Sequence, residues 1–127
     1  MSKVLIVDDD PVFRRLHVYL LRADGHETAE AETLGSAILL CQNDHFDVVV
    51  ADHFMPDGSG LELLDVLDTL EPRPRFLLIS GAPGLEDPRL GRVDLYLAKP
   101  VSSSDLQAAV AATAGPQIAN TPIMQPG

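Results

Sequence analysis

The chain has 127 residues, of which 46% are hydrophobic and 22% are charged, the profile of one ordinary globular domain. Its formal charge of −10 argues against nucleic acid as a direct partner, because phosphate contacts need clustered lysine and arginine. The apolar runs are too short for a membrane span, and the first one ends in aspartates, so we expect a cytoplasmic protein without a signal peptide.

The first predicted elements are a buried strand and an amphipathic helix. Residues 4–7 form a continuous aliphatic run, which is typical of a strand covered on both faces. A helix is expected to begin near Pro11 and to end at Gly25. Its apolar side chains recur at helical spacing, and we expect them to face the core: Phe13, Leu16, Leu20 and Ala23. Its arginines, Arg14 among them, would then face water.

The middle of the chain continues the alternation. Residues 26–31 predict a more exposed strand, and residues 33–43 a second helix. Residues 46–51 are the clearest buried strand, with Asp52 at its carboxyl end. A turn follows, and residues 61–70 predict a third helix.

The last third of the chain predicts two strands, at residues 76–79 and 95–98, and a final helix after the serines at 102–104. Residues 115–127 contain three prolines and no charge, and we expect them to form a disordered tail. Five strands alternating with helices predict a single α/β domain over residues 1–114, built on a parallel sheet.

Polar side chains follow four of these strands where each one ends: Asp8, Asp9, Asp10, Asp52, Ser80 and Lys99. Because the carboxyl ends of parallel strands share one edge of a sheet, these residues should converge. Gathered carboxylates repel one another unless a cation lies among them, and oxygen ligands suit Mg2+. Asp52 is the natural nucleophile for a phosphoryl group, since a metal and a lysine would flank it. Each residue alone also fits a structural role, but their shared position favours a site.

Four segments resemble the signature segments of response-regulator receiver domains. They are Val7-Asp8-Asp9, the run from residue 48 to Gly60 with its Met55-Pro56, Leu78-Ile79-Ser80-Gly81, and residues 95–100 ending in Lys99-Pro100. The resemblance extends from about residue 3 to residue 114, nearly the whole chain. It implies a doubly wound, flavodoxin-like sheet with strand order 2-1-3-4-5.

The resemblance also implies the chemistry of the site. Asp52 would accept a phosphoryl group from a histidine kinase or a histidine phosphotransfer protein. Asp9 and Asp52 would bind Mg2+ directly, Asp8 through water, and Phe54 through its backbone carbonyl. Lys99 would pair with the phosphoryl oxygens, and its bond to proline would be cis.

A second implication is a conformational switch. Ser80 would move toward the phosphoryl group, and Tyr96 would turn inward into the vacated space. Such a domain is not an enzyme in the usual sense. We expect no effector domain in this chain, and therefore a signalling protein, a monomer or weak dimer, that acts through a downstream protein partner.

Two features depart from the family pattern, the stretch between Ser80 and Lys99 and the residue at position 54. The stretch between Ser80 and Lys99 is shorter than usual by roughly one helical turn and is rich in glycine and proline, so we expect a short or broken fourth helix and a flexible loop at residues 81–92. Phe54 is apolar where many relatives are polar, which predicts an altered dephosphorylation rate. His53 is expected to point away from the site or into solvent.

Two other functions fit parts of the sequence. The Asp8-Asp9-Asp10 run superficially resembles the nucleophile loop of haloacid-dehalogenase-type phosphatases, but the usual following threonine is missing. An interaction module that keeps the fold without phosphorylation is the other alternative, and the shortened fourth segment is its best support.

Overall fold

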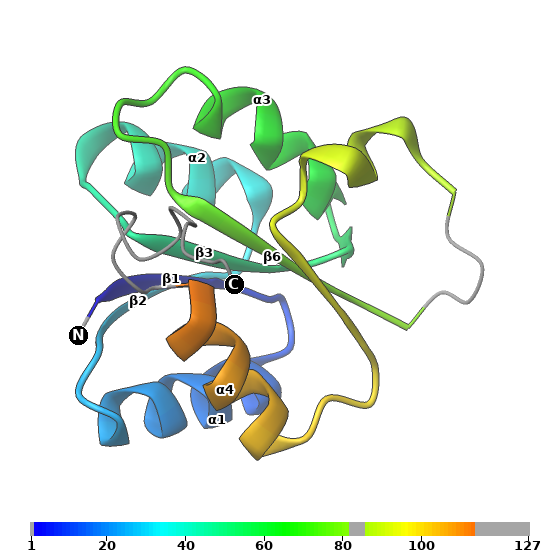
Figure 1. Cartoon of the computed structure of the whole chain (residues 1–127). Coiled ribbons are helices and arrows are strands. Elements are labelled where there is room, and N and C mark those ends of the chain that lie inside the picture. Colours follow the sequence, from blue (N-terminus) through cyan, green and yellow to red (C-terminus); the bar gives the residue numbers. More distant parts are fainter. Residues whose placement is uncertain (1, 82–85, 114–127) are drawn as a thin grey trace, which may run out of the picture.

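The computed structural model describes residues 2–81 and 86–113 of the chain. Five parallel strands form one sheet in the order β2-β1-β3-β6-β7 (Figure 1). Their bounds are Lys3–Val7 for β1, Glu27–Ala31 for β2, Val48–Asp52 for β3, Arg75–Ser80 for β6 and Leu95–Ala98 for β7. The predicted doubly wound sheet is therefore confirmed, with its five strands in the expected order. The tail predicted at residues 115–127 lies outside the described residues.

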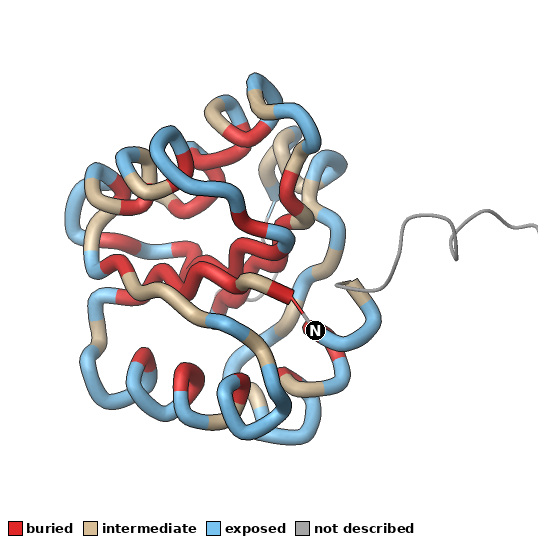
Figure 2. The backbone as a smooth tube through the Cα atoms, turned by 90° about the vertical axis from the view of Figure 1, so that its left-hand side faces the viewer, coloured by how far each residue is buried: buried red, intermediate tan, exposed pale blue. Residues whose placement is uncertain are grey.

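Helices cover both faces of the sheet (Figure 1). Helices α1 (Pro11–Ala23) and α4 (Ser103–Thr113) pack on one face, and α2 (Leu34–Asn43) and α3 (Leu63–Leu67) on the other (Figure 1). Alternate strand residues supply the two cores, because successive side chains point to opposite faces. Leu5 and Val49 belong to the core under α2 and α3, while Ile6 and Val50 belong to the other. Figure 2 shows this burial concentrated in the central strands.

Helix α1 has its buried face one residue away from the predicted one. The residues that face the sheet are Arg14, His17, Val18 and Leu21. Phe13 and Leu16, expected in the core, are exposed by 53% and 43%. The prediction was wrong because it assigned the arginines to water, whereas Arg14 reaches the buried Asp8 carbonyl and the half-buried Glu30 carboxylate at the carboxyl edge of the sheet.

The third predicted helix is shorter and partly of another type. Residues Gly60–Glu62 form a 3-10 turn, η1, and α3 ends at Leu67 rather than at residue 70. The Ser59 hydroxyl accepts from the Leu61 amide and the Glu62 carboxylate accepts from the Ser59 amide, so a capping box begins this turn. Leu61, Leu63, Leu64 and Leu67 are fully buried in the core that α3 shares with α2.

The segment between β6 and β7 contains a 3-10 helix, η2 (Pro88–Arg92), in its described part. The expected short fourth helix is thus confirmed, while the loop predicted to continue to Arg92 is wrong over these five residues. Residues 82–85 of the predicted loop lie outside the described residues. The Asp87 side chain caps η2 by accepting from the Arg89 amide, and Arg92 forms ion pairs with Asp65 and Asp68 near α3. These charged contacts tie η2 to the α3 side of the molecule.

Candidate functional site

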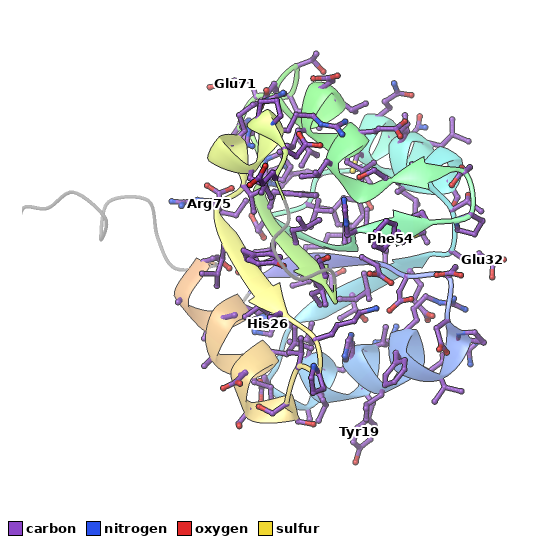
Figure 3. The ribbon with its side chains drawn as sticks, turned by 90° about the vertical axis from the view of Figure 1, so that its right-hand side faces the viewer. Tyr19, His26, Glu32, Phe54, Glu71 and Arg75 are labelled. Carbon is purple, nitrogen blue, oxygen red and sulfur yellow. The ribbon has the colours of Figure 1, made fainter. Side chains whose placement is uncertain are left out.

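Three carboxylates meet at the carboxyl edge of the sheet, the side from which Figure 3 views the molecule. Asp52 ends β3, and Asp8 and Asp9 directly follow β1, its neighbour in the sheet. One oxygen from each residue lies within 4.8 Å of the other two. Asp8 and Asp52 are buried, while Asp9 is exposed. The sequence prediction that these residues converge is confirmed.

Lys99 brings a positive charge to the same cluster. Its Nζ lies 3.1 Å from Oδ2 of Asp52, although the two residues are 47 positions apart in the sequence. The Lys99 amide donates to the Ser80 carbonyl at 2.9 Å, which fixes the start of this loop to the end of β6. The peptide bond between Lys99 and Pro100 is cis, as the family resemblance implied.

The electrostatics of the cluster favour a bound cation. Burial raises the pKa of Asp8 above its usual range, and the negative charges of Asp52 and Asp9 raise it further. A hydrogen bond from the Asp10 amide and the charge of Lys99 act in the opposite direction. A divalent cation among the three carboxylates would relieve their mutual repulsion.

The loop that carries Asp8 is held by the N-cap of α1, Asp10, and by one residue of the helix, Arg14. Asp10 is the N-cap of α1 and accepts from the Val12 and Phe13 amides, so it begins the helix. Nη1 of buried Arg14 donates to the Asp8 carbonyl at 2.9 Å, and its Nε donates to Glu30 at 2.9 Å. Arg14 therefore joins the Asp8 loop to β2, a role that sequence reasoning missed.

The loop after Asp52 turns sharply and returns beside it. Strands β4 (Phe54–Met55) and β5 (Gly58–Ser59) form a small antiparallel hairpin, and the Gly60 amide donates to the His53 carbonyl at 2.8 Å. A Cβ at position 60 would lie 2.2 Å from the Asp52 carbonyl oxygen, so the chain can approach this closely only at glycine. The Phe54 ring, labelled in Figure 3, is 64% exposed at this rim.

Asp57 ties the same hairpin to helix α2. Its two carboxylate oxygens accept from the Leu34 and Gly35 amides, at 2.9 and 3.1 Å. These amides belong to the first turn of the helix, where they have no partner within the helix itself. The hydrogen bonds hold the pKa of Asp57 below its usual range.

Ser80 ends β6, the strand beside β3, and His53 lies in an unexpected place. Ser80 is buried at the end of β6, whereas Tyr96 on β7 is 42% exposed. His53 is only 7% exposed, and its Nδ1 lies 3.3 Å from the Ser80 hydroxyl. Against the expectation that His53 points away from the site or into solvent, its side chain is buried and lies against the Ser80 hydroxyl. Its side chain does point away from Asp52, but the opposite face of β3 is buried and also receives Ser80.

A cavity of about 390 Å³ lies beside the cluster, lined among others by Asp8, Phe13, His17 and Lys99. His17 is buried, and burial lowers the pKa of its imidazole. Sequence reasoning did not single out His17. The signal that could have found it is the spacing of positions 14, 17, 18 and 21, a helical stripe hidden because two of its members are polar.

Comparisons with known proteins agree on one family. Residues 4–111 match the sequence family described as the response regulator receiver domain. The chain is 35% identical over 106 residues to the probable transcriptional regulatory protein TcrX of Mycobacterium tuberculosis, and 32% identical over 112 residues to the KDP operon transcriptional regulatory protein KdpE of Escherichia coli. These alignments include 81% and 85% of this chain but 45% and 49% of the two regulators. The chain therefore spans less than half the length of either.

Solved structures give the same result. A CheY-like receiver domain protein from Methanospirillum hungatei superposes with a TM-score of 0.82 at 28% identity, covering 90% of this chain and 94% of that one. The response regulator protein TrrA from Thermotoga maritima, solved in complex with Mg2+ and BeF, gives a TM-score of 0.80 at 26% identity, covering 89% and 99%.

The structure and the comparisons also bear on membrane helices and on nucleic acid as a partner. In the described part of the chain, the helices are too short or too polar to cross a membrane. The expectation that nucleic acid is not a direct partner finds no support, because several relatives are named as transcriptional regulators.

Proposed function

The chain belongs to the response-regulator receiver family of two-component systems, and on that premise we propose that it is a switch controlled by phosphorylation of Asp52 in the presence of Mg2+. The observation that carries the proposal is the contact between Lys99 and the buried Asp52 carboxylate, 3.1 Å apart beside two further aspartates. This set combines a nucleophile, a fixed positive charge and ligands for a hard cation.

The residues at the site fit a magnesium ion. Asp8, Asp9 and Asp52 offer three carboxylate oxygens close to one another, and we propose that the Phe54 carbonyl adds a fourth protein oxygen, with Asp8 acting through water. An all-oxygen donor set with only a few carboxylates is what Mg2+ prefers. The ion would neutralise charge on the incoming phosphoryl group.

The protein itself supplies the acceptor and its surroundings. A carboxylate oxygen of Asp52 would form a bond to phosphorus as the phosphorus–nitrogen bond of a phosphohistidine breaks, and the bonding electron pair would leave with the imidazole nitrogen. Lys99 would then pair with the phosphoryl oxygens in place of the free carboxylate. Asp52 stands at the end of a buried strand, so the acceptor is held in place before the donor arrives.

The response of the protein would begin at Ser80. Its hydroxyl would move toward the phosphoryl group and donate a hydrogen bond to it, and Tyr96 would turn from its 42% exposed position into the vacated space. The surface around β7 and η2 would change as a result. A downstream protein partner would read that change.

The proposed phosphoryl donor is a histidine kinase or a histidine phosphotransfer protein. A partly apolar surface suited to such a partner lies on α1, next to the acidic cluster. Its large exposed side chains are Val12, Phe13, Leu16 and Tyr19, and Figure 3 shows Tyr19 projecting from the helix. Exposed apolar patches of this kind mark protein contacts. Phe13 also lines the cavity that reaches Asp8 and Lys99, which makes this surface continuous with the site.

Titration with beryllofluoride and Mg2+, followed by NMR of the backbone amides, tests the proposal. We expect saturable shifts around Asp52, Ser80 and Tyr96 that need both components and that are lost in Asp52→Asn. Absence of binding to the wild-type chain would favour the interaction module without phosphorylation. Turnover of a chromogenic phosphate ester would instead favour a phosphatase.

A further inference from the structure

His53 and Ser80 leave their strands on the same face of the sheet. Asp52 and Ile79 are register partners in the parallel pair β3–β6. The His53 amide donates to the Ile79 carbonyl at 2.8 Å, which continues the ladder by one residue. Because successive side chains of a strand point to opposite faces, His53 and Ser80 both project away from the face that Asp52 occupies.

The two side chains meet in a buried environment. The Ser80 hydroxyl and Nδ1 of His53 are 3.3 Å apart, and the imidazole tautomer decides which of them donates. Ser80 is 1% exposed and His53 is 7% exposed. The Phe54 ring lies against the imidazole, with 4.3 Å between the ring centroids. A hydrogen bond in such a place is costly to leave unmade.

We propose that His53 is a positioning residue that holds the Ser80 hydroxyl in the unphosphorylated state. The inference rests on the proposed function of Asp52 and Ser80. In that function Ser80 moves toward a group bound on Asp52 and donates its one proton to that group, so a hydroxyl that donates to Nδ1 of His53 must give up this bond. The His53–Ser80 hydrogen bond therefore opposes activation, and the residue directly after the phosphoacceptor sets part of the balance between the two states.

A purely structural role for His53 makes a different prediction. If the imidazole only fills space between Phe54 and β6, its replacement by a ring of similar size should change little, or should change stability alone. If it holds Ser80, the effect of replacing it should depend on the presence of the Ser80 hydroxyl. A double-mutant cycle measures this dependence directly.

The test is the affinity of the whole chain for beryllofluoride in saturating Mg2+, measured by calorimetry. The proteins are the wild type, His53→Phe, Ser80→Ala and the double variant, with His53→Asn as the matched control. Phenylalanine keeps the ring without a hydrogen-bonding group, whereas asparagine places an amide near the position of Nδ1. If His53→Phe does not fold, His53→Leu, which also lacks such a group, replaces it in the cycle.

We expect His53→Phe to tighten binding by about 2- to 10-fold, the equivalent of one buried hydrogen bond. We expect His53→Asn to stay within about 2-fold of the wild type, and His53→Phe to have no effect in the Ser80→Ala background. Unchanged or weaker binding of His53→Phe, or an equal gain in both backgrounds, would overturn the role of His53 while leaving Asp52 as acceptor. If the wild type itself binds no beryllofluoride, the proposed function fails and this inference fails with it.

Discussion

Arg14 and Arg15 are adjacent residues that approach the same carboxylate from different environments. The Arg14 side chain is 9% exposed and its Nε lies 2.9 Å from Glu30, whereas the Arg15 side chain is 73% exposed and its Nε lies 3.3 Å from the same oxygen. Only Arg14 also donates to the buried Asp8 carbonyl. Replacement of each arginine by methionine keeps most of the side-chain stem and removes the charge. The pair therefore separates a buried ionic contact from an exposed one.

The two substitutions should differ clearly in their effect on the free energy of unfolding. A hydrogen bond to a charged group contributes about 1.5–3 kcal/mol to stability. The contribution of Arg14 is reduced because the Glu30 side chain is 30% exposed and also pairs with Arg15. We therefore expect Arg14→Met to cost about 2 kcal/mol. An exposed pair contributes about 1 kcal/mol or less, so Arg15→Met should lie below that value.

Urea unfolding followed by circular dichroism provides the measurement, with the midpoint compared at an unchanged slope. Added salt should reduce the small effect of Arg15→Met and leave most of the effect of Arg14→Met, because buried pairs are screened less. Equal losses for the two variants would refute the assignment of Arg14 to the buried face of α1.

Three further predictions concern the loop that follows Asp52. Gly60→Ala should destabilise the fold by about 1–3 kcal/mol, because its Cβ would lie 2.2 Å from a backbone oxygen of Asp52, whereas Gly91→Ala, with no neighbour within 4 Å of its Cβ, should change stability by about 0.5 kcal/mol or less in thermal unfolding. Asp57 has a folded-state pKa below its ordinary value of 3.8, so its contribution is present above that pH and is lost as the pH falls through the folded value. Below about pH 4 the wild type should therefore lose more stability than Asp57→Asn, and parallel losses in acid titrations of the two proteins would contradict this. Phe54→Asn should shorten the lifetime of the phosphorylated state, since an amide at this rim can orient an attacking water that the apolar ring cannot, and an unchanged decay of the radiolabelled protein would exclude the effect.

The sheet and most of the site follow from the sequence because strong local signals agree with one another. The aliphatic run before Asp52 predicts a strand buried on both faces, and the observed strand is buried throughout. Parallel strands share a carboxyl edge, so the positions of Asp8, Asp52 and Lys99 at strand ends were enough to predict their approach.

The parts that could not be predicted are those where polar residues are buried with partners far away in the sequence. The charge of Arg14 predicts an exposed side chain, and only its contacts with the Asp8 carbonyl and Glu30 explain why it faces the sheet. Alternation correctly turns His53 away from Asp52, but it cannot show that β6 brings Ser80 to the same place. The 3-10 turn η2 begins at a proline and contains a glycine, and it is held by ion pairs to α3 that no local pattern reveals.

The most direct test of the central claim is the intact mass of the protein after incubation with acetyl phosphate and Mg2+. We expect the wild type to gain one phosphoryl group, Asp52→Asn to gain none, and the gain to disappear when a chelator removes the metal. A phosphoryl group that persists in the variant, or that forms equally well without a divalent cation, would contradict a magnesium-dependent acceptor at Asp52.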